Sequence, residues 1–186
     1  MATEQGDTSS PTNVPALPNP ARVITTTNLD TSIASFDKTF EESLAVTQNL
    51  GGTLLRLAYV SGQAPEALNE GNLSAYGGYL EKPPPLFTPG GGATVWYIDI
   101  PPGAGSPLHR TISLDFVTII DGELQLMLDS GETRLMKPGD IIIQRGTMHR
   151  WTNLSTDRWA RMVGILSESE PIVLNDGQKL GTAGLD

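Results

Sequence analysis

The stretch GELQLMLDSGETRLMKPGDIIIQRGTMHRWTN, residues 122–153, consists of short apolar runs separated by turns that contain Gly or Pro. Leucines at alternate positions from Leu124 to Leu128 are typical of a strand with one buried face. The pair Pro138-Gly139 is a turn signal, because Pro fixes the corner and Gly supplies a positive φ. The stretch therefore predicts a series of short antiparallel strands.

The same pattern extends over residues 93–166, from ATVWYIDI through to WARMVGIL. Twenty glycines and fourteen prolines fit many turns better than long helices. About eight strands at this spacing predict a closed barrel or jelly roll. We therefore expect an all-β domain with few short helices.

Composition divides the rest of the chain. The first residues are rich in Ser, Thr, Pro and Asn and cannot bury enough surface to offset the entropy of ordering. The predicted parts are a flexible N-terminal tail (1–21), an arm and loop region that packs on the barrel (22–92), the barrel core (93–170) and a C-terminal tail (171–186).

Two interpretations of the arm remain open. Phe36, Phe40 and Leu44 recur at four-residue spacing, which predicts a short helix over residues 36–48. The alternative is an extended arm across the barrel that includes a strand at 53–60. Residues 61–92, with KPPP and TPGGG, are expected to form a loop that serves either as a lid or as a surface connection.

Charge and residue content exclude several classes of function. The formal net charge of −9 disfavours binding to nucleic acid or to an anionic membrane. The absence of Cys rules out disulfides, thiolate metal sites and a Cys nucleophile. No apolar run approaches the roughly 18 residues that span a bilayer. The N-terminus carries no secretory signal pattern, so the expected location is the cytoplasm.

The only two histidines in the chain stand in two separate motifs within the β region. The first motif has Gly103, then His109 six positions on, and ends at Gly122. The second has Gly139 and Gly146 before His149, and Asn153 four positions after it. Together they resemble the two motifs of the cupin superfamily. That resemblance implies a jelly-roll β-barrel; metal-binding members use three His and one Glu that face its interior.

The sequence departs from that ligand set in two places. Thr111 stands where the second His would be, and Asp115 stands where the Glu would be. We therefore favour no metal; a divalent Fe, Mn, Ni or Zn ion, if bound, would use His109, Asp115 and His149. On a straight strand residues 109 and 115 would lie about 20 Å apart, so they meet only if the chain turns near Ser113-Leu114.

The candidate site follows from these motifs. We expect His109 and His149 to act as an acid/base pair, with Asp115 as an orienting or second acidic group. Arg110 should point away from the pocket, because it alternates with its neighbours. Core packing is the alternative role for the aromatic candidates. The candidates for substrate binding are Thr111, Gln144, Arg145, Trp96 and Trp151.

Three functions fit this sequence. The favoured one is a lyase or isomerase that performs dehydration, decarboxylation, isomerisation or cyclisation. The His-Arg-Thr and Gln-Arg-Gly segments are similar to those of compact cupins, some of which accompany fungal polyketide or terpenoid pathways. The alternatives are a metal-dependent oxygenase or lyase, and a barrel that binds a small molecule without catalysis. A homodimer is expected, because unpaired sheet edges favour association.

Overall fold

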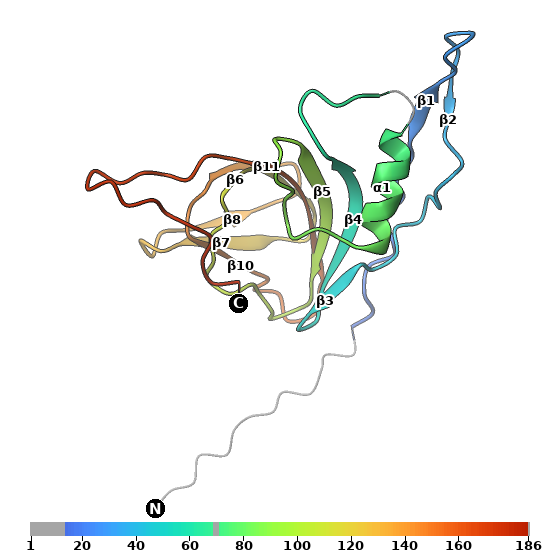
Figure 1. Ribbon diagram of the computed structural model, residues 1–186. Coiled ribbons are helices and arrows are strands. Elements are labelled where there is room, and N and C mark those ends of the chain that lie inside the picture. The colour runs from blue at the N-terminus through green and yellow to red at the C-terminus, as the bar shows by residue number, and fades with distance from the viewer. Residues whose placement is uncertain (1–13, 69–70, 186) are drawn as a thin grey trace, which may run out of the picture.

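The computed structural model describes residues 14–68 and 71–185, which fold mainly as β-sheet with one short helix (Figure 1). Within these residues the elements are β1 (Thr25–Thr27), β2 (Ala34–Phe36), β3 (Gln48–Leu50), β4 (Thr53–Ser61), α1 (Asn72–Glu81), β5 (Ala93–Ile100), β6 (Ser113–Asp121), β7 (Leu124–Leu128), β8 (Thr133–Met136), β9 (Ile141–Arg145), β10 (His149–Thr152) and β11 (Ala160–Glu168).

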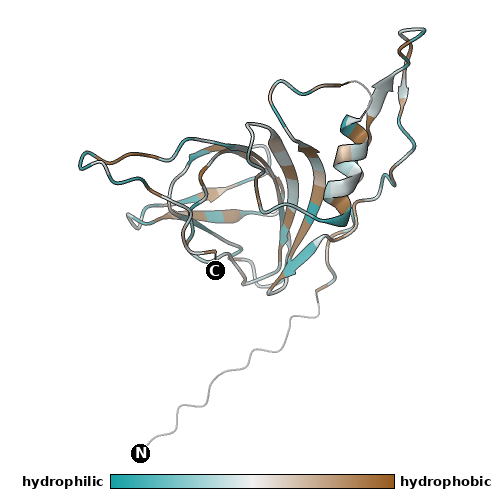
Figure 2. Ribbon diagram, viewed as in Figure 1, coloured by the Kyte–Doolittle hydropathy of each residue, from teal (hydrophilic) through white to brown (hydrophobic). Residues whose placement is uncertain are grey.

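Two antiparallel sheets form the barrel. The larger has six strands in the order β3-β4-β5-β11-β6-β9, and the smaller has the order β10-β7-β8. Isolated bridges at Gly105↔Thr152 and His109↔His149 join the segment between β5 and β6 to β10 of the smaller sheet. Figure 2 shows hydrophobic residues along β4 and β5, while the loop tips are hydrophilic. The all-β jelly-roll prediction is confirmed.

Two glycines permit close contacts that hold the barrel together. A Cβ on Gly105 would lie 2.4 Å from the Trp151 carbonyl oxygen. Gly122 has a φ of +68°, and a Cβ there would lie 2.8 Å from the Trp159 carbonyl oxygen. Any side chain at either position would push two segments apart, which explains glycine at these two points.

The helix does not lie where the sequence spacing predicts it. Residues 36–48 contain no helix; instead α1 occupies part of the region expected to be loop. Phe40 and Leu44 act as separate anchors of an extended arm: Leu44 is buried, and the Phe40 ring packs edge-on against Tyr76 at 5.1 Å between centroids. The predicted strand at 53–60 is present as β4.

Tyr76 attaches α1 to the larger sheet. It is fully buried, and its hydroxyl donates to the Ala58 carbonyl oxygen on β4 at 2.9 Å. It belongs to a cluster on the larger sheet, separate from the one that fills the barrel. The first contains Leu55, Leu57, Val60, Tyr76, Trp96 and Leu166, and the second contains Ile100, Val117, Ile119, Leu124, Trp151, Ala160 and Met162.

Residues 14–20 lie against the larger sheet beside a buried ionic cluster. Asp99 is fully buried and accepts from Arg56 Nη1 at 2.6 Å and from Arg161 Nε at 2.6 Å. Arg56 Nε also donates to Asn19, and Arg161 Nη2 donates to the Pro18 carbonyl oxygen. The rest of the predicted flexible tail, residues 1–13, lies outside the described residues. Among the described helices, none has the length and apolarity to cross a bilayer.

Candidate active site

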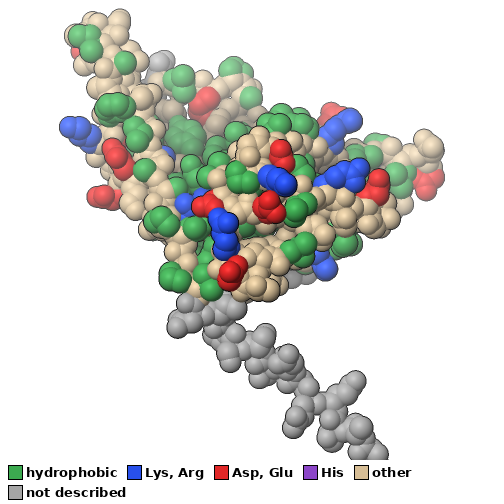
Figure 3. Space-filling view, turned by 180° about the vertical axis from the view of Figure 1, so that it is seen from behind, with side chains coloured by type: hydrophobic (Ala, Val, Ile, Leu, Met, Phe, Trp, Pro, Cys, Tyr) green, Lys and Arg blue, Asp and Glu red, His purple; other side chains and the backbone are tan. Residues whose placement is uncertain are grey.

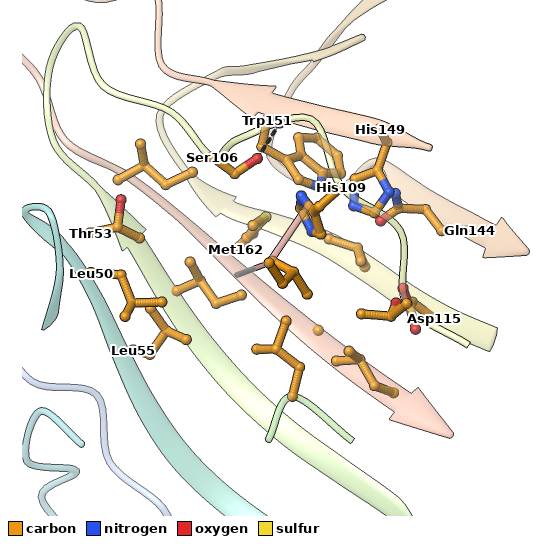
Figure 4. Close-up of a pocket in the computed structure, with 18 of the residues that line it drawn as sticks. Leu50, Thr53, Leu55, Ser106, His109, Asp115, Gln144, His149, Trp151 and Met162 are labelled. Carbon is orange, nitrogen blue, oxygen red and sulfur yellow. Dashed lines mark hydrogen bonds between the residues drawn. The ribbon is translucent and has the colours of Figure 1, made fainter. Parts of the chain in front are cut away.

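A cavity of about 140 Å³ opens from the barrel interior, and its walls are mainly hydrophobic (Figure 4). Cavities of about this size admit a single six-membered ring. His109, Asp115, Gln144 and His149 lie toward one end, whereas Leu50, Thr53 and Leu55 lie at the other. The polar lining residues on which the chemistry depends are Ser106, His109, Thr111, Asp115, Gln144 and His149.

His109 and His149 are held opposite each other by the backbone. The His109 amide donates to the His149 carbonyl oxygen at 2.9 Å, and the His149 amide donates to the His109 carbonyl oxygen at 2.8 Å. Their rings lie 4.3 Å apart between centroids, at 52°. Both side chains are buried, and no histidine is visible on the face shown in Figure 3. The backbone bridge therefore fixes the spacing of the two imidazoles.

The same local arrangement orients each imidazole. His109 Nδ1 lies 2.9 Å from the Pro107 carbonyl oxygen, and His149 Nδ1 lies 2.9 Å from the Thr147 carbonyl oxygen. A carbonyl oxygen only accepts hydrogen bonds, so each Nδ1 carries the proton when the ring is neutral. The Nε2 atom of each ring then has the lone pair that can accept a proton from a ligand.

Burial affects the protonation of two groups in this cavity. It lowers the pKa of His149 to about 4; the Thr147 hydrogen bond opposes this shift, and the nearby His109 adds to it. Burial raises the pKa of the Asp115 carboxyl to about 6, against a smaller opposing effect of Ser113. His149 is therefore neutral at pH 7, and Asp115 changes its charge close to neutral pH.

Asp115 and Gln144 form the polar end of the cavity together with the histidines. They lie directly opposite each other where β6 pairs with β9. Each has a relative exposure of 4%, and neither Asp115 Oδ1 nor Gln144 Nε2 has a hydrogen-bond partner among the described residues. Unpaired buried polar atoms are costly, so these two atoms are suited to a ligand.

The turn that brings Asp115 to this cavity lies slightly before the predicted position. β6 already begins at Ser113, so the chain bends at Thr111 and Ile112. His109, Asp115 and His149 consequently line the same cavity. Thr111 also lines it, and its hydroxyl shares a 2.7 Å hydrogen bond with the Ser113 hydroxyl. Trp151 contributes part of the wall.

Two candidates for substrate binding lie outside the cavity. Arg145 is exposed, because it follows the inward-facing Gln144 and so points to the opposite face of β9. Trp96 is fully buried in the cluster on the larger sheet, and its Nε1 donates to the Leu86 carbonyl oxygen at 2.9 Å. Core packing is therefore what the structure shows for Trp96. Arg110, also outside the cavity, donates from Nε to the Gly181 carbonyl oxygen.

Several lining residues were not predicted from the sequence. Leu185 reaches the cavity because Ala183 forms an isolated bridge with Arg110 beside His109. Leu50 and Thr53 come from the β3–β4 turn, far from either histidine motif in the sequence. Strand alternation in β11 places Met162, Gly164 and Leu166 on one face, but it does not identify that face as cavity wall.

The side chains present do not match the metal site of metal-binding cupins. Among the described residues, no group of three or more His, Asp or Glu side chains is arranged to hold a metal ion. Thr111, at the position of the second His, is paired with Ser113. His109 and His149 supply only two nitrogen donors, fewer than the three protein ligands of a site built from two histidines and one carboxylate.

Two antiparallel sheets surround a pocket, and each of the two glycine-containing motifs supplies one histidine to it. This arrangement defines a cupin-type barrel. The family model for the cupin domain matches residues 96–165. Over 168 residues the chain is 38% identical to phomopsin biosynthesis cluster protein D of Diaporthe leptostromiformis, covering 90% of this chain and 87% of that protein. The chain belongs to the cupin family.

Other relatives are similar over most of the chain. Oryzines biosynthesis cluster protein J of Aspergillus oryzae is 39% identical, covering 84% of this chain and 87% of that protein. The cupin-domain-containing oxidoreductase fogC of Aspergillus ruber is 32% identical, covering 84% of this chain and 72% of that protein. Among solved structures, the polyketide cyclase RemF of Streptomyces resistomycificus is 13% identical with a TM-score of 0.49, covering 81% of this chain and 85% of that one.

Proposed function

We propose that this cupin is a tailoring enzyme that transfers protons on a small, largely apolar metabolite of polyketide or terpenoid type. The reaction class is dehydration, decarboxylation, isomerisation or cyclisation. One observation carries the proposal: two imidazoles line the same hydrophobic cavity as a buried carboxyl group. Their Nδ1–H groups are fixed by hydrogen bonds, and their Nε2 atoms have no partner among the described residues. A neutral imidazole beside a carboxyl group with a raised pKa is suited to general acid–base catalysis.

His149 has the properties of the initial base. It is neutral at pH 7 because burial lowers its pKa, so its Nε2 can accept a proton from a bound substrate. The protonated ring is disfavoured in the same surroundings and returns the proton readily in the second half of the reaction. His109, whose ring lies 4.3 Å away, provides the second imidazole of the pair. Asp115, with its raised pKa, supplies the acidic group.

The relatives support a role in fungal secondary metabolism. The names of two relatives, 38% and 39% identical to this chain, place them in the phomopsin and oryzine biosynthesis clusters. We therefore assign this chain to the modification of a pathway intermediate, with the reaction determined by the side chains described above.

The test compares products rather than binding. Purified protein is incubated with a metabolite extract from the source of the gene, and the products are separated by liquid chromatography and mass spectrometry. We expect a product that the wild type and Arg150→Ala form and that His149→Ala fails to form. Arg150 is a matched control because it is the next residue on β10 and is exposed. Ligand retention without any new product would instead indicate a binding barrel.

The names of other relatives favour a second candidate, an oxidoreductase. FogC and the protein virC of Hypocrea virens, 42% identical over 98 residues, are both called cupin-domain-containing oxidoreductases. This candidate needs a transition metal with the His109 and His149 Nε2 atoms as ligands and non-protein ligands at the other positions. It predicts about one Fe, Mn, Ni or Zn ion per chain by elemental analysis, and activity that chelators abolish. Activity that survives chelation would exclude it.

A further inference from the structure

The unpaired atoms of Asp115 and Gln144 point to the kind of ligand that this cavity takes. Both residues are buried in the cavity, and each offers one polar atom that no described residue satisfies. A carboxylate oxygen only accepts hydrogen bonds, whereas an amide nitrogen only donates them. A ligand that satisfies both atoms must therefore present a donor and an acceptor side by side.

We propose that Asp115 and Gln144 form a subsite for an uncharged hydroxy-carbonyl group, in which the ligand hydroxyl donates to Asp115 Oδ1 and the ligand carbonyl accepts from Gln144 Nε2. The two residues lie directly opposite each other on neighbouring strands, so their Cβ atoms are about 5 Å apart. From this spacing the two side chains can converge on a hydroxyl and a carbonyl that are one or two carbons apart. This subsite rests on the proposed function, for which it names the substrate class.

The surroundings exclude an anionic ligand group. No Lys or Arg among the described residues lines the cavity, so a ligand carboxylate would be buried without a counter-ion beside Asp115. The remaining walls are mainly hydrophobic, and the volume of about 140 Å³ fits a single six-membered ring. In Figure 4, Asp115 and Gln144 lie at the histidine end of the cavity. A ring held there by its oxygens would lie against the hydrophobic walls close to the imidazoles.

The experiment measures binding of four probes by ligand-detected NMR: 2-hydroxycyclohexanone, 3-hydroxycyclohexanone, cyclohexanone and cyclohexanol. The rings are alike, so differences report the oxygens. A site built for two hydrogen bonds rejects a ligand that leaves one buried group unpaired. We expect at least one hydroxyketone to bind about tenfold more tightly than either single-oxygen probe.

Two variants remove the subsite without changing its size much. Asp115→Leu and Gln144→Met should each abolish the tenfold preference, while the binding of cyclohexanone changes little. Gln125→Met, on β7 and outside the cavity lining, should keep the preference. Equal binding of all four probes to the wild type, or no detectable binding of either hydroxyketone, overturns the subsite.

The two proposals fail independently. Loss of the preference in the subsite variants is a binding result and does not depend on whether His149 transfers a proton. If His149→Ala keeps the binding preference but no product is ever found with the wild type, the subsite stands and the enzyme proposal fails. If His149→Ala abolishes a product but the wild type shows no binding preference, the enzyme proposal stands and the subsite fails.

Discussion

His109 and His149 are joined by a pair of backbone hydrogen bonds of 2.9 and 2.8 Å, which hold their rings 4.3 Å apart. Each ring is also fixed by a hydrogen bond from Nδ1 to a carbonyl oxygen two residues earlier. The two motifs therefore supply one imidazole each, and the barrel brings the two rings together at an angle of 52°. The acid–base proposal depends on this arrangement.

The arrangement predicts the tautomer of both histidines. At pH 7.5 we expect His149 to show the ¹⁵N chemical shifts of a neutral imidazole protonated at Nδ1, because its Nδ1 donates to a carbonyl oxygen. The neutral form of His109 should carry its proton on Nδ1 for the same reason. The His149 signal should titrate near pH 4, where burial places its pKa. An Nε2-protonated form of His149, or a titration near pH 6.5, would contradict the structure.

The pKa shifts of His149 and Asp115 predict opposite effects of pH on stability. In the unfolded chain His149 binds a proton below about pH 6.5, whereas in the folded chain it binds one only below about pH 4. The contribution of His149 to stability therefore falls as the pH drops through that range. Folded Asp115 keeps its proton up to about pH 6, whereas the unfolded chain releases it near 3.8, so its contribution falls as the pH rises. Each contribution amounts to roughly 3 kcal/mol, since one pKa unit corresponds to about 1.4 kcal/mol.

Substitutions separate these two contributions. Between pH 4 and 6.5, the unfolding free energy of Asp115→Leu should rise with pH more steeply than that of the wild type. The unfolding free energy of His149→Gln should fall with pH relative to the wild type. Urea denaturation at several pH values measures both slopes. Parallel curves for all three proteins would show that neither pKa is shifted in the folded state.

Replacing the unpaired polar atoms should stabilise the fold at the expense of binding. An unsatisfied buried donor or acceptor costs about 1–3 kcal/mol. We therefore expect the double variant Asp115→Leu/Gln144→Met to gain unfolding free energy of about that size at pH 7, measured by urea denaturation. Gln125→Met should stay within about 0.5 kcal/mol of the wild type. A double variant less stable than the wild type would mean that the two side chains support the fold.

The fold was predictable from the sequence because its determinants are local. Alternating leucines in β7 and glycine-containing turns specify short strands without reference to distant contacts. The helix was not predictable in this way. α1 contains Gly77 and Gly78, which weaken it, and it forms where Tyr76 packs between β4 and the Phe40 ring. Tertiary packing determines its position.

The candidate site likewise has residues that local motifs predict and residues that only distant pairing places there. The two motifs led to His109, His149, Asp115 and Gln144, all of which line the cavity. Leu185 could not be predicted, because it reaches the cavity only through the pairing of Ala183 with Arg110, 73 positions away in the chain. Proximity to a motif was also insufficient, since the alternation of β9 turns the side chain of one neighbour, Arg145, outward.

The ionic cluster on the larger sheet should contribute strongly to stability. Asp99→Ala would leave Arg56 and Arg161 buried without a counter-ion, and breaking such a cluster costs about 3–5 kcal/mol. Asp121→Ala is the control, because its pair with Arg158 is exposed and 3.5 Å long, so its loss costs at most about 1 kcal/mol. Chemical denaturation of both variants measures the difference. Equal losses of unfolding free energy would mean that the attraction within the buried cluster is offset by the cost of removing its charges from water.

We propose, finally, that the exposed face of β6 and β9 binds a second copy of this chain. β9 is an edge of the larger sheet, and Ile141 and Ile143 are 64% and 49% exposed beside Phe116, which is 39% exposed. In a symmetric dimer, edge strands and apolar faces of two copies meet their own equivalents and cover each other. Light scattering should give about twice the chain mass of 19.9 kDa, and Ile143→Glu should halve it. Leu135→Glu, an equally exposed position on β8, should leave the dimer intact. A wild-type mass of one chain at micromolar concentration would rule out this interface.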